Sequence, residues 1–285
     1  MLKNGAEKTG FSAFLLNIFL FALKMAAGIM SGSLAVISDA LNSFLDCLSY
    51  LLAFLSIRFS GQAPDRDHPF GHRRAEPLSA LVVAIFTGIL GIEILKSAIM
   101  GMMGEDGAIE ITEFTFAALG IAILIKIFMH FYLMRSAKEN MSSSLEALAI
   151  DSRNDVLATS VALLGVASSY AGIAIMDKVA AIGIAFYILR SGYLIAKKNI
   201  DYLLGASPDR KMMKELRTAA KSVEGVKGLS VLRAHYVGDR LHVEAGIVLD
   251  RKMKTEKTHE IGVRVQKKLE GIRLVSRAFV HIDYE

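Results

Sequence analysis

The sequence predicts a mostly α-helical membrane protein, in which a bundle of six transmembrane helices precedes a small α+β domain. Hydrophobic residues make up 53% of the 285 residues, and the mean hydropathy of +0.43 excludes an ordinary soluble domain. Six runs are long enough to cross a bilayer, which takes about 20 mostly apolar residues. The four prolines, Pro64, Pro69, Pro77 and Pro208, fall outside the middles of these runs, as boundary residues should.

The expected transmembrane domain covers residues 1–206. Its first apolar run lacks a convincing cleavage site and is long enough to span, so we interpret it as a helix and not as a signal peptide. We expect six spans, at about residues 11–30, 34–57, 78–103, 114–134, 145–170 and 173–196.

Basic residues flank one set of helix ends, whereas the opposite connections are uncharged (31–33), acidic (105–113) or balanced (177–178). Short basic loops stay in the cytoplasm. We therefore expect a multi-pass protein of a bacterial inner or plasma membrane with both termini cytoplasmic, and the charge needs no nucleic-acid partner. The flanking basic residues are Lys3, Lys8, Arg58, Arg66, Arg73, Arg74, Arg135, Lys138, Lys197 and Lys198.

Residues 207–285 have the composition of a soluble domain. Apolar spacing predicts a helix, two strands split by Gly238-Asp239, a second helix and a closing strand. This order indicates an open sheet with helices on one face, which is an α+β arrangement. The expected elements lie at 209–223, 226–237, 240–249, 255–269 and 274–282.

Two pairs of polar residues stand inside apolar runs, Asn42 with Asp46 and Asp151 with Asp155. A spacing of four residues places both members of a pair on one helix face. Ionised groups at membrane depth are costly and usually line a site or pathway. Together the pairs offer oxygen ligands for a hard or borderline divalent cation. Alternatively, they hydrogen-bond between helices and bind nothing.

Neighbouring residues in the same spans have weaker claims. Asp39 lies three residues before Asn42, where it either lines a pathway to the site or ends the helix in water. Ser43 and Ser152 could support the ligands as hydrogen-bond donors. The single cysteine, Cys47, excludes an intramolecular disulfide. Its side chain points about 100° away from Asp46 on a helix, so we expect a packed thiol and not a ligand.

Lys126 and His130 belong to the fourth expected span. We expect them near its cytoplasmic end, where a long side chain can extend to the interface. We assign neither residue to the polar site.

A second candidate site is the loop between the second and third spans, with Asp65, His68 and His72 shaped by Pro69 and Gly71. Two imidazoles beside carboxylates make a plausible nitrogen–oxygen metal site. The alternative is an ordinary solvated loop, in which His and Asp are common.

A third candidate set lies in the C-terminal domain, with His235, His242, His259, His281 and Asp283. His281 and Asp283 are two residues apart on a strand and therefore share a face. Spacing alone does not bring His259 to them. Surface histidines are the simpler explanation for His235 and His242.

Three segments together resemble the cation diffusion facilitator family of divalent-metal/proton antiporters. They are SLAVISDALNSFLD (33–46), DHPFGHRRAE (67–76) and AIDSRNDVL (149–157). The resemblance implies a non-enzymatic transporter, a homodimer with a transport site in each protomer, and a ferredoxin-like, metallochaperone-like cytoplasmic domain at 207–285 that dimerises. It also implies a transport site of Asn42, Asp46, Asp151 and Asp155 and a loop site of Asp65, His68 and His72.

Departures from the family pattern bear on the metal. Zinc-exporting members carry His at the position of Asp151, and His or Asp at that of Asn42, whereas nitrogen ligands are absent here. Oxygen ligands suit manganese and, less sharply, ferrous iron. We therefore expect Mn²⁺ first, Fe²⁺ second and Zn²⁺ third. The family's tail site uses a His in each of the first two strands, and Ser230 and Ala245 stand there. The resemblance implies that His259, His281 and Asp283 match the remaining ligands, so half a site remains.

The expected mechanism follows from ligand chemistry. Metal ligands must be deprotonated, so metal and protons compete for the same carboxylates. Exchange of the two needs no ATP or prosthetic group, and no phosphate-binding Gly-Lys-Ser/Thr loop occurs. The alternatives are a zinc or broad-range exporter, a metal-gated channel and a membrane-anchored metal sensor.

Overall fold

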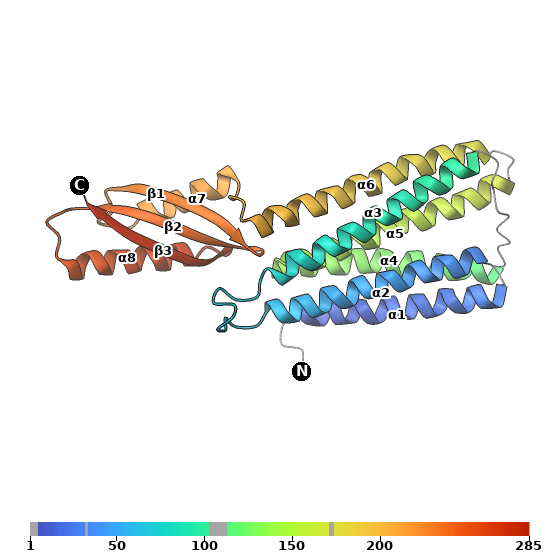
Figure 1. The fold of residues 1–285 in the computed structure, drawn as a ribbon, viewed down its shortest axis with the longest axis horizontal. Helices are drawn as coiled ribbons and strands as arrows, with labels where there is room; N and C mark the ends of the chain where they lie inside the picture. Colours follow the sequence, from blue (N-terminus) through green and yellow to red (C-terminus); the bar gives the residue numbers. More distant parts are fainter. Residues whose placement is uncertain (1–4, 32–33, 103–112, 171–173, 285) are drawn as a thin grey trace. The chain divides into compact units, whose positions relative to one another are not determined.

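The computed structural model describes residues 5–31, 34–102, 113–170 and 174–284. The chain divides into two compact units, Met1–Asn199 and Ile200–Glu285. The first unit is helical, and the second contains a three-stranded sheet with its own helices (Figure 1). This confirms the mostly α class with an α+β C-terminal domain.

The described residues of the first unit form six long helices, and the last of these helices ends at Leu204, within the residues of the second unit. Each has 27 to 31 residues. At 1.5 Å per residue each is about 40 Å long, which exceeds the hydrocarbon thickness of about 30 Å. The helices are α1 (Gly5–Ser31), α2 (Leu34–Ser60), α3 (Ala75–Met102), α4 (Glu113–Asn140), α5 (Ser143–Tyr170) and α6 (Ala174–Leu204).

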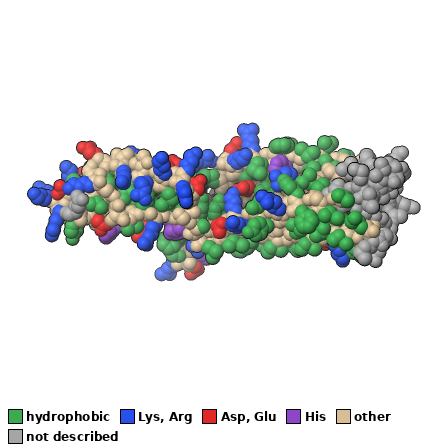
Figure 2. Space-filling view, turned by 90° about the horizontal axis from the view of Figure 1, so that it is seen from above, with side chains coloured by type: hydrophobic (Ala, Val, Ile, Leu, Met, Phe, Trp, Pro, Cys, Tyr) green, Lys and Arg blue, Asp and Glu red, His purple; other side chains and the backbone are tan. Residues whose placement is uncertain are grey.

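Among the described residues, three helical stretches are both long and apolar enough to cross a membrane: Gly5–Ala26, Ala75–Met102 and Gly120–Asn140. They belong to α1, α3 and α4, and each corresponds to an expected span. On one face of the molecule, hydrophobic side chains are dense over the long helices, whereas Lys and Arg gather over the C-terminal unit (Figure 2).

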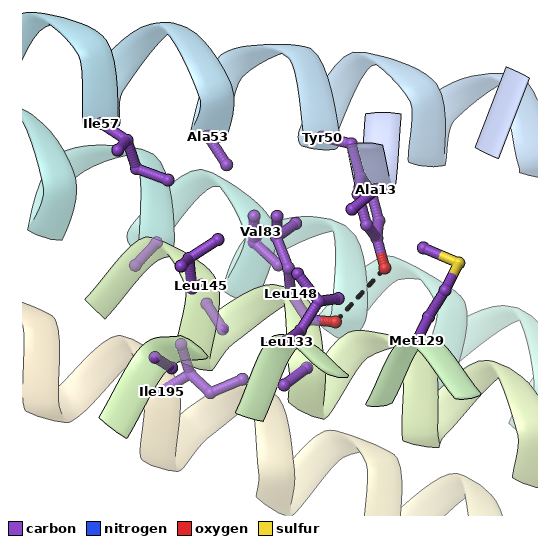
Figure 3. Close-up of a cluster of buried hydrophobic side chains, with 14 of the residues drawn as sticks. Ala13, Tyr50, Ala53, Ile57, Val83, Met129, Leu133, Leu145, Leu148 and Ile195 are labelled. Carbon is purple, nitrogen blue, oxygen red and sulfur yellow. Dashed lines mark hydrogen bonds between the residues drawn. The ribbon is translucent and has the colours of Figure 1, made fainter. Parts of the chain in front are cut away.

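A shared apolar core holds the bundle together. Helix α1 packs on α2 and α4, and α5 packs on α3 and α4. Tyr50, Met129 and Leu148 are fully buried in this core, and Figure 3 shows the Tyr50 hydroxyl bonded to the Leu148 carbonyl. Between helices that cross a membrane, close packing and interhelical hydrogen bonds such as this one stabilise the bundle, because lipid tails are as apolar as the buried side chains.

The second unit follows the expected order of elements. They are α7 (Arg210–Lys221), β1 (Gly228–Val237), β2 (Arg240–Leu249), α8 (Thr255–Glu270) and β3 (Val275–Tyr284). Strand β2 is central and pairs antiparallel with β1 and parallel with β3. Asp209 caps α7 by accepting a hydrogen bond from the backbone N–H of Met212.

The two helices of this unit cover the apolar face of the sheet. Alternate β2 residues, Val243, Ala245, Ile247 and Leu249, are fully buried against both helices. The other β2 residues project to the opposite face, as strand alternation requires. Those of β3 that share this second face include His281 and Asp283.

Candidate metal sites

Three carboxylates come together inside the helical unit, Asp46 from α2 and Asp151 and Asp155 from α5. Each offers an oxygen within 4.8 Å of the others. Asp151 and Asp155 are buried, with 5% and 8% of their surface exposed. The four-residue spacing within α5 places both on the face that meets α2. The three described carboxylates of the predicted site therefore lie close enough together to share one cation.

Asn42 and Asp39 lie in α2, but their side chains are outside the described residues. The backbone places Asn42 one turn from Asp46. Ser43 and Cys47 are buried, and the Cys47 thiol does not belong to the carboxylate cluster. The expectation of a packed thiol agrees with this arrangement.

Helix α3 supplies a support for the cluster that sequence reasoning missed. The hydroxyl of Thr87 donates a hydrogen bond to Asp151 Oδ1 at 3.2 Å. The other oxygen, Asp151 Oδ2, is buried without a hydrogen-bond partner among the described residues. Thr87 therefore orients Asp151 and leaves one oxygen for a ligand. A threonine in an apolar span gives no sequence signal for this role.

Ser152 plays a different part from the one expected. Its hydroxyl lies 2.6 Å from the Tyr50 hydroxyl and donates to the Leu148 carbonyl at 3.0 Å. Tyr50 in turn links α2 to α5 one turn from Asp46. Ser152 thus stabilises the contact between the two ligand-bearing helices through Tyr50 and the Leu148 carbonyl.

Lys126 is the main correction to the sequence analysis. Its ammonium group donates to Asp46 Oδ2 at 3.1 Å and makes a still closer ion pair with Asp155 Oδ2. The side chain is only 5% exposed, and Nζ lies 5.5 Å from the centre of the Tyr50 ring. The expectation that Lys126 extends to the interface is wrong. It occupies the middle of its span, where a charge normally marks a site, and that signal was available.

His130 also points inward. Its Nδ1 lies 2.6 Å from the carbonyl oxygen of Ala149 on α5. His130 lies one turn along α4 from Lys126, on the same helix face. Its contact with Ala149 fixes the rotation of α4 against α5. It therefore turns the Lys126 side chain toward the carboxylates.

The loop residues expected to form a second site also come together. Asp65 Oδ1 lies 3.4 Å from His68 Nδ1, and Asp65 Oδ2 lies 3.2 Å from His72 Nε2. The backbone N–H of His68 donates to Asp65 at 2.6 Å. This bond is the main reason that the pKa of the Asp65 carboxyl is lowered.

Local packing holds the imidazoles of this loop in place. The Phe59 ring meets the His72 ring with 4.4 Å between centroids. Gly71 has φ of 84°, which favours glycine and turns the chain between the two histidines. His72 is buried, and its Nδ1 has no hydrogen-bond partner among the described residues. The arrangement offers two nitrogens and a carboxylate to a borderline metal ion.

The tail set is less complete. His281 Nε2 lies 3.2 Å from Asp283 Oδ1, and Ser230 donates to Asp283 Oδ2. His259 is exposed on α8. Of the residues that the structure describes, the metal-like clusters are the carboxylate and loop groups alone. One chain therefore does not bring His259 together with His281 and Asp283.

The structure also corrects the position that we matched to the family's tail-site histidine on the second strand, which was Ala245. Ala245 is fully buried on the helix-covered face of β2. The β2 residue beside Ser230 and Asp283 is Gly246. Strand alternation separates the two positions, so Ala245 was the wrong choice by one residue.

Two family models match the chain. One describes the cation efflux transmembrane domain and matches residues 10–204, and the other describes the cytoplasmic domain of cation efflux proteins and matches residues 208–285. The chain belongs to the cation efflux family. This confirms the resemblance carried by the three segments, and it makes the protein a membrane-integral metal transporter and not an enzyme.

Individual relatives are similar over most of the chain. The uncharacterized transporter MJ0449 of Methanocaldococcus jannaschii is 31% identical over 94% of each chain. Metal tolerance protein 11 of Arabidopsis thaliana is 31% identical over 94% of this chain and 68% of its own. The manganese efflux system protein MneS of Bacillus subtilis is 25% identical over 93% of this chain and 91% of its own.

Proposed function

We propose that this cation efflux protein exports Mn²⁺ in exchange for protons, with Fe²⁺ as the second substrate and Zn²⁺ as the third. The transport site consists of Asn42, Asp46, Asp151 and Asp155, with Asp39 on the pathway to it. The observation that carries the proposal is the cluster of three carboxylates from α2 and α5. The name of the relative MneS, a manganese efflux protein, supports the choice of metal.

Ligand chemistry favours manganese at this cluster. Carboxylate and amide oxygens suit Mn²⁺, whereas imidazole and thiolate favour zinc. Asp151 occupies the position of the histidine expected in zinc exporters, and the Cys47 thiol is outside the cluster. An all-oxygen site therefore selects against zinc by ligand type.

Proton exchange follows from the same oxygens. A carboxylate binds metal in its deprotonated form, so metal entry releases any proton bound there. Proton entry from the opposite side then promotes metal release. The carboxylates of α2 and α5 thus carry metal in one direction and protons in the other.

Further features are assigned by the same proposal. Asp65, His68 and His72 form a second metal site in a cytoplasmic loop, supported by their mutual distances. The protein acts as a homodimer through its C-terminal domain, which the family model for the cytoplasmic domain covers. Both termini face the cytoplasm, in accord with the basic residues beside that set of helix ends.

Transport by purified protein in proteoliposomes tests the proposal. Mn²⁺, Fe²⁺, Zn²⁺, Co²⁺ and Cd²⁺ are supplied separately, with a metal-sensing dye and a pH-sensing dye inside the vesicles. We expect the fastest flux for Mn²⁺, with proton movement in the opposite direction. Metal flux that is independent of the proton gradient would indicate a channel, and the absence of flux would indicate a sensor.

A further inference from the structure

We propose that Lys126 is a tethered cation that competes with the transported metal for the carboxylates. The incoming divalent ion displaces the Lys126 ammonium from Asp46 and Asp155, and the return of the ammonium helps to release the ion. This inference rests on the proposed function and assigns to α4 a residue that tunes affinity and turnover at the same site.

The geometry places Lys126 where a metal would bind. Its Nζ contacts oxygens from both ligand-bearing helices, Asp46 Oδ2 at 3.1 Å and Asp155 Oδ2 more closely. These carboxylates belong to the group whose oxygens lie within 4.8 Å of one another. An ion held by that group therefore meets the ammonium directly. A divalent ion bound only to the carboxylate oxygens that Lys126 does not contact would still be repelled by the ammonium, because two like charges a few ångströms apart repel strongly in a buried site.

The lysine side chain suits a reversible competitor. A buried ammonium at membrane depth is stable only beside a counter-charge, and here two carboxylates supply it. The ammonium is a compact charge on a flexible four-carbon stem, so it can leave one partner without moving the backbone. The His130 contact with the Ala149 carbonyl holds α4 in register while the stem moves.

Tethering also separates divalent from monovalent cations. An attached ammonium has a high effective concentration at the site, which a monovalent ion of equal charge cannot easily outcompete. A divalent ion gains twice the Coulombic attraction to the same carboxylates and can displace it. Lys126 therefore keeps Na⁺ and K⁺ from binding to the carboxylates. It also weakens the binding of the transported divalent ion enough to permit its release.

The test compares Lys126→Met, Lys126→Gln and Lys126→Arg in the full-length protein. Mn²⁺ affinity is measured by titration calorimetry on the purified protein, and transport is measured in proteoliposomes. We expect both neutral variants to bind Mn²⁺ at least about tenfold more tightly and to transport it more slowly, because release loses its competitor. Lys126→Arg should bind Mn²⁺ more weakly, because a guanidinium pairs with carboxylates through two hydrogen bonds.

Lys96→Met is the matched control, because it removes a lysine from α3 whose side chain is exposed. It should leave both the dissociation constant and the rate unchanged. Weaker or unchanged binding in folded neutral variants would overturn the inference and make Lys126 a structural tie. If the neutral variants do not fold, an unchanged or lower dissociation constant in Lys126→Arg would overturn it.

The outcome for the wild-type protein separates this inference from the proposed function. If the wild type binds no Mn²⁺ and Lys126→Met does, the lysine competes with the metal as inferred, but the proposal that the wild-type protein transports Mn²⁺ is wrong. If neither protein binds Mn²⁺, both proposals fail. If the wild type transports Mn²⁺ and the variants match it, the inference alone fails.

Discussion

Ser230 on β1 donates a hydrogen bond to Asp283 on β3, across the central strand of the C-terminal sheet. The bond passes over Gly246, where a Cβ atom would overlap the Ser230 hydroxyl. A register shift between Leu229 and Val231 marks a bulge in β1 at Ser230. Bulges re-aim side chains in this way. The bulge and the glycine together allow two outer strands to interact over the middle one.

Gly246→Ala should destabilise the C-terminal domain. The added methyl group would push Ser230 and Asp283 apart, at a cost of about 1–3 kcal/mol typical of overpacking. The melting temperature of the purified protein measures the loss. Gly228→Ala is the control in the same sheet, because its Cβ would meet only Val248 at an ordinary contact distance of 3.9 Å. Equal effects of the two substitutions would contradict this account.

Asp46→Ala or Asp155→Ala should abolish Mn²⁺ transport. Each change removes a carboxylate from the cluster and also one partner of Lys126. Flux in proteoliposomes checks the result, with gel filtration to show that the protein remains folded and dimeric. Asp201→Ala, at an exposed position of α6, should transport like the wild type. Normal flux in either cluster variant would refute the site.

Asp151→His should shift preference from manganese toward zinc. The change replaces an oxygen ligand by imidazole, which zinc favours, and we expect the Zn²⁺/Mn²⁺ rate ratio to rise by about tenfold, or roughly 1.4 kcal/mol. Thr87→Val serves as the companion variant, because it removes the hydrogen bond to Asp151 Oδ1 and keeps the ligand. It should slow both metals alike. An unchanged ratio in Asp151→His would show that this position does not set selectivity.

The loop site should depend on pH through Asp65. The backbone N–H of His68 stabilises the ionised carboxylate and lowers its pKa below the ordinary value of 3.8. Because the pKa of Asp65 is lower in the folded protein, its ionised carboxylate contributes fully to folding stability at any pH above the pKa that it has in the unfolded protein. This contribution disappears as the pH falls through the pKa of Asp65 in the folded protein. The Asp65–His68 contact should therefore persist at mildly acidic pH and open only in strong acid.

Carboxyl NMR of Asp65 during an acid titration measures this midpoint. The reference is a short unstructured peptide with the same loop sequence, whose Asp65 should titrate at higher pH. Equal midpoints in the protein and the peptide would show that the hydrogen bond from His68 is absent in solution.

Local patterns in the sequence were enough to predict the secondary structure and part of each candidate metal site. Apolar run lengths predicted the long helices, and alternation with turn residues predicted the helix–strand–strand–helix–strand order of the C-terminal domain. Spacing of four residues placed Asp151 with Asp155 on one helix face. The loop triad of Asp65, His68 and His72 was also within reach, because eight residues that contain Pro69 and Gly71 cannot separate far. Each of these features depends on neighbours in the chain.

Tertiary structure alone decided which distant side chains complete the sites. Lys126 lies 80 residues from Asp46 and 29 from Asp155, and Thr87 lies 64 from Asp151. Whether a lysine in α4 meets carboxylates or extends to the interface depends on the rotation of α4, which its packing against α5 sets. Ser230 and Gly246 likewise meet Asp283 only through a bulge and a strand register. Helix rotation and strand register are relations between elements, so the spacing within one element does not contain them.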